Sequence, residues 1–170
     1  MKKKTGPIKL GIIGLGRAGW GMHTPEIGHR LDKFIAVAGC DPIPEFRKRF
    51  ADHWKCAVYA KPEELVADPN VEVVVVASRS TQHVEHALLA LKAGKDVFQE
   101  KPIATTHKEA LKLKAAAAKS KGRLFIRHNR RFEPGFQHVR EIIASGVLGN
   151  VYDIKLRRDG FSRREDWQTL

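Results

Sequence analysis

The chain has 170 residues, a formal net charge of +12, and apolar and charged contents ordinary for a folded globular protein, which argues against disordered and fibrous classes. A chain of this length can bury one core and little more, so we expect a single domain or slightly more. The longest apolar run, 73–77, is too short to cross a bilayer, and the basic start 2–4 lacks the continuous apolar stretch of a signal peptide. These features predict a cytoplasmic protein with no membrane partner.

Residues 8–13 predict a short buried strand that runs into a glycine-rich turn and then a helix. In that turn Gly14 permits the tight bend, Gly16 lets the backbone approach a pyrophosphate, and Gly19 lets the helix pack close to the sheet. The start of the helix offers unpaired N–H groups and a positive dipole to phosphates. The segment is therefore typical of a dinucleotide-binding loop.

Asp41 follows the predicted second strand, 34–39, at the distance where such proteins place a ribose-binding acid. Its carboxylate can accept hydrogen bonds from the adenosine ribose hydroxyls, which favours NAD over NADP. Two alternatives stay open at this point. The glycines can serve a tight turn in any doubly wound protein, and a methyltransferase also ends its second strand in an acid.

Strands and helices alternate as far as residue 128, which predicts a parallel sheet covered by helices on both faces. The further predicted strands are 57–59, 72–77, 95–99 and 123–127. The further predicted helices are 44–54, a turn opened by Pro62, a helix capped by Ser80 or Thr81 and ended by Gly94, and one from the Thr106–Glu109 capping box to about Ser120. Residues 1–128 thus read as an α/β domain of the Rossmann type.

Beyond residue 128 the pattern changes. Residues 132–145 predict an amphipathic helix, Gly146 and Gly149 a turn, and 151–158 a half-buried strand with alternating apolar and polar side chains. Too few residues follow this strand to give it a partner within the chain. We therefore expect 129–170 to form only the start of a second, truncated α/β domain, with a strand edge that could recruit another chain.

Most of the positive excess falls after residue 100, and such asymmetry can mark a nucleic-acid-binding surface. The sequence has no recognition-helix, zinc-finger or aromatic RNA-binding motif, so we expect no nucleic-acid partner. Cys40 and Cys56 lack CxxC spacing and a nearby histidine pair, which predicts small buried side chains and neither a disulfide nor a metal site.

Four ordered motifs give a resemblance to a known family. They are the glycine segment 14–19, the stretch Gln-Glu-Lys-Pro-Ile-Ala-Thr at 99–105, Arg-Phe-Glu-Pro at 131–134, and Gly-Val-Leu-Gly at 146–149. Together they resemble the glucose–fructose oxidoreductase/inositol dehydrogenase (Gfo/Idh/MocA) family across essentially the whole chain. The resemblance implies a Rossmann domain followed by an α/β domain with a large open sheet. It also implies NAD(P)-dependent chemistry at a carbinol carbon of a sugar or cyclic polyol, and a homo-oligomer in the full-length form.

The resemblance also implies roles for individual residues. It places Lys101 at the substrate hydroxyl, where an amine helps to move the proton as hydride leaves the carbon. Glu100 and Pro102 would shape the strand end beside the nicotinamide, with a Lys101–Pro102 peptide that can be cis. The expected cofactor-binding residues are Gly14, Leu15, Gly16, Arg17, Ala18, Gly19, Asp41, Ser78, Arg79, His83, Glu100, Lys101, Pro102 and Asn129.

Three points qualify these assignments. Core or capping roles are equally open for His83 and Asn129, and Arg79 stands where the family commonly has proline. The family's second catalytic element, an Asp and a His a few residues apart, has no counterpart up to Leu170. The chain is thus expected to carry the cofactor half of an oxidoreductase and to turn over poorly alone. A non-catalytic NAD-binding regulatory or assembly module is the alternative.

Short-chain dehydrogenases are excluded because their Tyr-xxx-Lys pair is missing. Tyr152 and Lys155 are only three residues apart, and on a strand they would point to opposite faces.

Overall fold

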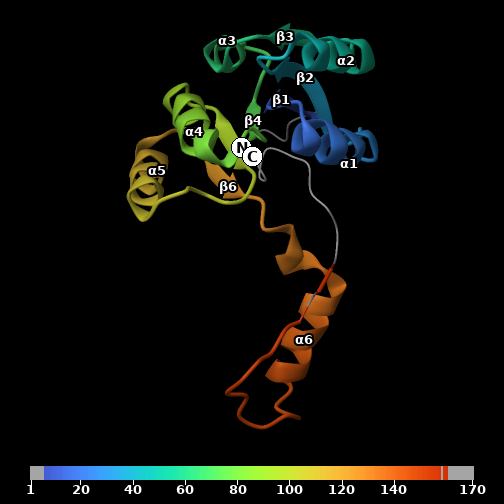
Figure 1. Ribbon diagram of the computed structural model, residues 1–170, viewed down its shortest axis with the longest axis vertical. Coiled ribbons are helices and arrows are strands. Elements are labelled where there is room, and N and C mark those ends of the chain that lie inside the picture. Colours follow the sequence, from blue (N-terminus) through green and yellow to red (C-terminus); the bar gives the residue numbers. More distant parts are fainter. Residues whose placement is uncertain (1–5, 158, 161–170) are drawn as a thin grey trace. The chain divides into compact units, whose positions relative to one another are not determined.

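The computed structural model describes residues 6–157 and 159–160, and the chain divides into two compact units, 1–128 and 129–170. The first unit holds a six-stranded parallel sheet in the order β3-β2-β1-β4-β5-β6 (Figure 1). Its strands are β1 (Ile8–Ile13), β2 (Phe34–Cys40), β3 (Ala57–Tyr59), β4 (Val73–Val76), β5 (Asp96–Gln99) and β6 (Leu124–Ile126). This order is that of a Rossmann-type doubly wound sheet, so the expected fold is confirmed for this unit.

Helices cover the two faces of the sheet. They are η1 (Gly19–His23), α1 (Thr24–Gly28), α2 (Pro44–Trp54), α3 (Pro62–Ala67), η2 (Ser80–Gln82), α4 (His83–Lys92) and α5 (His107–Lys119). On one face, Ile27 of α1 and Phe50 of α2 enter the core. On the other, side chains of α3, α4 and α5 do so, among them Leu65 and Leu113. None of the described helices combines the length and apolar composition needed to cross a membrane.

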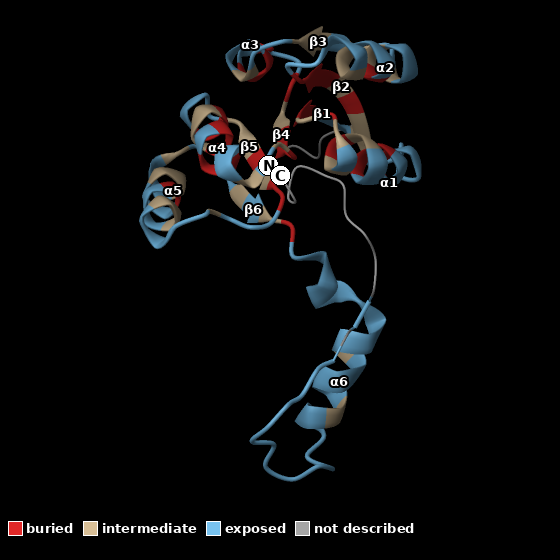
Figure 2. Cartoon of the chain, in the orientation of Figure 1, coloured by how far each residue is buried: buried red, intermediate tan, exposed pale blue. Residues whose placement is uncertain are grey.

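Strand β4 lies at the centre of this arrangement, and its valine run supplies both cores. Val74 and Val76 belong to the core under α3, α4 and α5, whereas Val75 belongs to the core under α1 and α2. All three are buried, and buried residues concentrate along the central strands in Figure 2. Because side chains alternate across a strand, an unbroken apolar run indicates a strand covered on both faces, as expected for β4. Each such side chain contributes about 1.5–3 kcal/mol on burial.

The start of α4 differs from the expected cap at Ser80 or Thr81. These residues form the 3₁₀ turn η2, and α4 begins at His83 after Gln82, which makes no side-chain capping bond. The tighter turn satisfies an amide that a cap would have served, because the Gln82 N–H donates to Arg79 O at 2.8 Å. At α5 the expected capping box is confirmed, with Thr106 Oγ1 accepting from the Glu109 N–H at 3.2 Å.

The second unit contains the 3₁₀ turn η3 (Asn129–Phe132) and α6 (Pro134–Ala144), which confirms the expected helix. The strand expected at 151–158 is wrong for the part the structure describes, because residues 151–157 are irregular and 158 lies outside the described residues. A strand is held by hydrogen bonds to a neighbour, and an alternating pattern alone cannot supply one. Tyr152 and Leu156, which were expected to be half-buried, are 99% and 90% exposed.

Candidate functional site

The carboxyl ends of the parallel strands meet at one edge of the sheet in a common register. Ile13 at the end of β1 pairs with Cys40 of β2 on one side and with Val76 of β4 on the other. Val76 in turn pairs with Gln99 at the end of β5. In open α/β sheets this edge is where ligands bind, and the order reverses here between β1 and β4, a topological switch point.

The residues that follow these strands lie in one row along the edge. Asp41 follows β2, Gly14 follows β1, and Glu100 with Lys101 follows β5. The backbone hydrogen bonding of the sheet continues beyond the strand ends into these residues. The Gly14 N–H donates to Cys40 O at 2.8 Å, and the Glu100 N–H donates to Val76 O at 2.9 Å. Strands lie about 4.8 Å apart, so the two ends of the row are about 14 Å apart. The sheet thus brings the acid, the glycine turn and the lysine to one edge.

The glycine turn between β1 and η1 is closed at its two ends and open in the middle. Gly14 has a φ of +92°, and a Cβ there would lie 2.6 Å from the Ala77 carbonyl oxygen. A Cβ on Gly19 would lie 1.9 Å from the carbonyl oxygen of Gly14, whereas one on Gly16 would meet only Phe46, at 3.8 Å. The helical segment begins at Arg17. The first turn of a helix offers backbone N–H groups and a positive dipole, and here it lies beside an uncrowded backbone, which suits a phosphate.

Asp41 is buried and bonds to the protein's own backbone. One carboxylate oxygen accepts from the Leu15 N–H at 2.8 Å, and the other accepts from the Ile43 N–H at 2.9 Å. The side chain therefore ties the end of β2 to the glycine turn, a structural role that sequence reasoning did not include. The Leu15 amide is used internally as well. Each carboxylate oxygen can accept a second hydrogen bond, so a ribose hydroxyl would not have to displace these contacts.

Two arginines of α2 flank the turn, and sequence reasoning missed both. Arg47 Nη1 donates to Asp41 O at 2.7 Å, and Arg49 Nη2 donates to Leu15 O at 3.0 Å. The Arg49 guanidinium also lies 4.2 Å from the centre of the Trp20 ring. The available signal was the basic run 47–49 within the helix predicted at 44–54. The two cations raise the local affinity for an anion.

Glu100 belongs to a buried cluster of charged groups at the β5 end of the row. Its Oε1 lies 3.2 Å from Arg127 Nη1 and 3.0 Å from His23 Nε2, and Arg127 also pairs with Glu26. The contact with His23 is an ion pair only when the imidazole is protonated. Burial alone would raise the pKa of Glu100, but the His23 contact and the Arg127 charge outweigh it and lower that pKa. Sequence reasoning did not single out His23 or Arg127.

Lys101 and Pro102 form the turn after β5, and the peptide bond between them is cis, as expected. The Lys101 side chain is exposed at the edge. The Pro102 carbonyl oxygen faces inward, 2.8 Å from His83 Nδ1 and 3.4 Å from Gln99 Nε2. His83 is only 2% exposed, and both of its ring nitrogens contact backbone carbonyl oxygens, those of Pro102 and Ser78.

The remaining predicted site residues are divided between the two units. Ser78 follows β4, and its hydroxyl lies 2.8 Å from Nδ1 of His86, whose pKa is lowered by burial. Arg79 is exposed next to it. Asn129 opens η3 and belongs to the second unit, whereas the other predicted site residues belong to the first.

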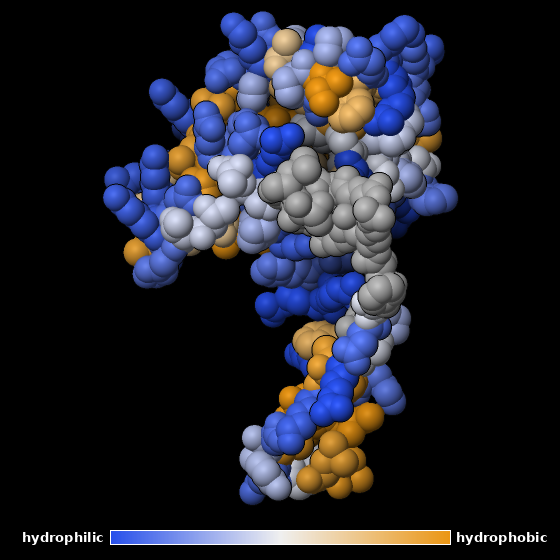
Figure 3. Space-filling view, in the orientation of Figure 1, coloured by the Kyte–Doolittle hydropathy of each residue, from blue (hydrophilic) through white to orange (hydrophobic). Residues whose placement is uncertain are grey.

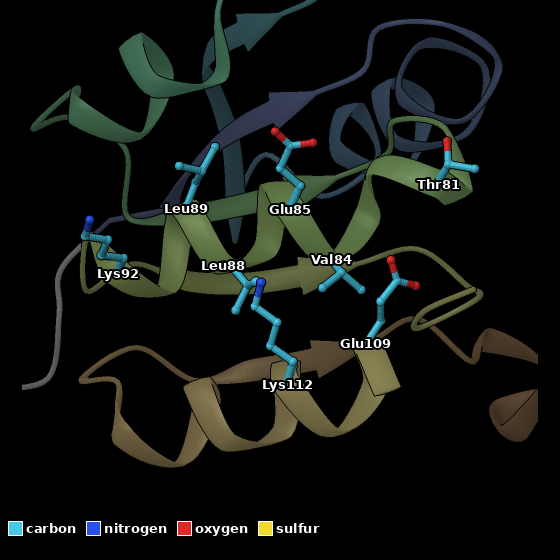
Figure 4. A pocket seen from close by; sticks show the side chains of 8 residues that line it. All are labelled: Thr81, Val84, Glu85, Leu88, Leu89, Lys92, Glu109 and Lys112. Atoms are coloured by element: carbon cyan, nitrogen blue, oxygen red, sulfur yellow. The ribbon is translucent and has the colours of Figure 1, made fainter. Parts of the chain in front are cut away.

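A groove of about 400 Å³ lies elsewhere, along η2, α4 and α5 (Figure 4). It is lined by the side chains of Thr81, Val84, Glu85, Leu88, Leu89, Lys92, Glu109 and Lys112. None of these is a predicted site residue, and none follows a strand end. The row at the strand ends is the better candidate because the loops from several strands converge there.

Comparison with known proteins gives a family match over the first unit of the chain. Residues 8–128 match the model of an oxidoreductase family with an NAD-binding Rossmann fold, Gfo/Idh/MocA. The chain is 32% identical over 159 residues to scyllo-inositol 2-dehydrogenase (NADP(+)) IolW of Bacillus subtilis, covering 92% of this chain and 44% of that protein. It is also 32% identical over 152 residues to myo-inositol 2-dehydrogenase of Thermotoga maritima, covering 88% and 44%.

A solved structure gives a similar result. The WlbA dehydrogenase of Bordetella pertussis, in complex with NADH and UDP-GlcNAcA, matches with a TM-score of 0.83 and 26% identity. The match covers 88% of this chain and 43% of that one. The chain therefore spans less than half the length of the relatives it matches.

Proposed function

We propose, since the chain belongs to the Gfo/Idh/MocA family of oxidoreductases, that it is the NAD-binding part of an enzyme acting on CH–OH groups of sugars or cyclic polyols. The observation that carries this proposal is the open backbone over Gly16, which lies on the same strand-end edge as Lys101. On this proposal, residues 129–170 begin the substrate-binding domain, and the complete enzyme is a homo-oligomer.

The nicotinamide coenzyme, when bound, supplies the hydride acceptor or donor. The loop around Gly16 would hold the pyrophosphate through the first amides of the helical segment, with Arg49 raising the local positive potential. Lys101 Nζ would exchange a proton with the substrate hydroxyl, whose O–H bond must break as the carbon is oxidised. Ser78, Arg79 and Pro102 would form the wall between these two positions.

For the coenzyme itself we propose NAD over NADP. The buried Asp41 carboxylate would lie beside the adenosine ribose, where it can accept from the hydroxyls and would repel a 2′-phosphate. The B. subtilis relative is named as an NADP(+) enzyme, so both coenzymes are compared directly. Isothermal titration calorimetry of the folded protein with NAD and with NADP tests this preference directly. Tighter binding of NADP would contradict the assignment of Asp41.

The sharpest test of the site is Gly16→Val. Because a Cβ at Gly16 meets only Phe46 at 3.8 Å, we expect the variant to fold and its side chain to occupy the phosphate position. The dissociation constant for NAD should rise about tenfold or more, with the unfolding midpoint nearly unchanged.

Gly21→Val is the matched control, because it adds the same side chain where no atom lies within 4 Å of the new Cβ. It should bind NAD like the wild type. Equal binding by the Gly16→Val variant, or no heat from either coenzyme with folded wild-type protein, would refute the proposed site.

A second candidate function is an NAD-binding assembly or regulatory module. It is favoured by apolar side chains that lie exposed in the second unit, such as Val147, Leu148 and Tyr152. Figure 3 shows apolar side chains gathered over the α6 segment of that unit. Light scattering with size-exclusion chromatography tests this function, which predicts a concentration-dependent oligomer. A strictly monomeric protein over a wide concentration range would contradict it.

A further inference from the structure

The exposed Lys101 lies between two residues held by buried partners. On one side, Glu100 is fixed through its N–H to Val76 O and through its carboxylate to Arg127. On the other side, Pro102 is fixed through its carbonyl oxygen, which lies 2.8 Å from His83 Nδ1. The position of the Lys101 amine therefore depends on how firmly these neighbours are held, because their backbone sets the direction of its side chain.

His83 connects two of the loops that form the candidate site. Its second ring nitrogen, Nε2, lies 3.0 Å from Ser78 O in the connection after β4, while Nδ1 reaches the turn after β5. Carbonyl oxygens only accept hydrogen bonds, and a neutral imidazole carries one N–H, so it donates to one of the two; the shorter contact is the one from Nδ1 to Pro102 O. A buried ring that lost these partners would leave polar groups unsatisfied inside the protein, which is unfavourable.

We propose that His83 is a positioning residue for Lys101, acting through its hydrogen bond to the Pro102 carbonyl. The role rests on the proposed function, in which Lys101 exchanges the substrate proton. His83 itself does not touch the reacting atoms on this proposal, because it is buried behind the turn. Its contribution is to keep the cis turn, and with it the lysine backbone, in one orientation relative to the β4 loop.

Gln99 makes a related contact but holds a different part of the turn. Its Nε2 donates to Ile103 O at 2.7 Å and approaches Pro102 O only at 3.4 Å. The short bond to the residue next to Lys101 therefore comes from His83. Loss of His83 would leave the turn held by Gln99 at Ile103, with only the longer 3.4 Å contact remaining at Pro102 O.

Two conservative variants separate the contacts of His83. In His83→Asn, the side-chain amide reaches roughly the position of Nδ1 and can still donate to Pro102 O. In His83→Gln, the amide reaches roughly the position of Nε2 and can donate to Ser78 O. His83→Leu removes both contacts. His107→Asn is the matched control, because His107 is also the first residue of a helix but is exposed.

The readout is the Lys101 side chain itself. Lysines of the full chain are dimethylated with ¹³C-formaldehyde, and the Lys101 signal in the NMR spectrum is assigned by its absence in Lys101→Arg. The shift of this signal on adding saturating NADH measures where the amine lies relative to the coenzyme. The NADH dissociation constant and the unfolding midpoint are measured on the same samples.

We expect the NADH-induced shift to be kept in His83→Asn and His107→Asn, and to fall to about a third or less in His83→Leu and His83→Gln. The NADH dissociation constant should stay within about threefold in all of them. A full shift in His83→Leu, or equal loss in His83→Asn and His83→Leu, would overturn the proposal. Either result would mean that the Pro102 bond does not set the lysine.

Failure of the proposed function would look different. If the wild type does not bind NADH, the shift has no meaning, and hydrogen exchange of the Glu100 amide in the free protein decides the matter, because this amide donates to Val76 O at 2.9 Å immediately before Lys101. It should exchange about tenfold faster in His83→Leu than in the wild type, with His83→Asn close to the wild type. Unchanged exchange in His83→Leu would refute the positioning role independently of any coenzyme.

Discussion

Helices α5 and α6 are both amphipathic, but their apolar faces lie in different surroundings. In α5, Leu113 is completely buried in the core under α3, α4 and α5. In α6, among the residues the structure describes, Phe136, Val139 and Ile143 are each at least one-third exposed, and no residue of the helix is buried. Figure 2 gives the same contrast for the two units as a whole. An apolar stripe therefore predicts a helix, whereas its burial depends on elements elsewhere in the chain.

Glycine-to-alanine substitutions in the two units give the largest expected difference in stability. In Gly19→Ala the new Cβ would lie 1.9 Å from Gly14 O, so the helix must move away from the glycine turn. We expect a loss of about 3 kcal/mol or more in unfolding free energy, measured by urea denaturation. Gly135→Ala in α6 has no atom within 4 Å of its Cβ and should be neutral or slightly stabilising. Equal effects would contradict the difference between the units.

A second comparison uses leucines. Leu113→Ala removes a fully buried side chain and should cost about 2–3 kcal/mol, because a cavity remains in the core. Leu148→Ala makes the same change where the side chain is 60% exposed, and should stay within about 0.5 kcal/mol of the wild type. Chemical denaturation measures both. A large loss for Leu148→Ala would indicate that residues of the second unit are covered in solution.

The distinction between a local pattern and its packing partners also explains what could be predicted from the sequence. Strand β4 was recognisable because four consecutive valines suit a strand buried on both faces, and the glycine turn because each glycine has its own steric reason. The alternation at 151–158 predicted a strand that the described residues do not form, since pairing needs a neighbour that no local pattern encodes.

At the site, the residues next in sequence to a motif were found and those brought in by the fold were missed. Lys101 and Asp41 follow predicted strands and could be named from their positions. His23 and Arg127 are separated from Glu100 by long stretches of chain, and only the sheet order brings them together. The backbone bonds of Asp41 could not be foreseen either, because they depend on the relative position of β1 and β2.

A third comparison measures how the stability contributed by two carboxylates depends on pH. The pKa of Glu100 is lowered in the folded protein, so its charged form stabilises the fold above the unfolded carboxyl pKa, and this stability is lost as pH falls through the folded value. Glu100→Gln should cost about 1–3 kcal/mol at neutral pH. The cost should shrink as the solution is acidified, because the protonated carboxyl and the amide are alike in charge.

Glu133→Gln is the control in the second unit, because Glu133 pairs with Arg130 at the surface, where both side chains are about half exposed. It should change stability little at any pH in this range. Denaturation curves of the two variants and the wild type between pH 3 and pH 7 give the comparison, a range that spans the ordinary carboxyl pKa of about 4.3. A cost for Glu100→Gln that does not vary with pH would mean that Glu100 is not charged in the folded state.

The smallest expected effect concerns how the two helices begin. At α5, Thr106 accepts from the Glu109 N–H at 3.2 Å, and Glu109 accepts in return from the Thr106 N–H at 3.2 Å. Thr106→Ala should therefore cost about 1 kcal/mol and speed the hydrogen exchange of the Glu109 amide. At α6, Glu133 makes no capping bond through its side chain, so Glu133→Ala should leave the first amides of that helix exchanging as before. If Glu133→Ala speeds exchange as much as Thr106→Ala does, the start of α6 is held by its side chain as firmly as α5, and the difference between the helices lies only in their apolar faces.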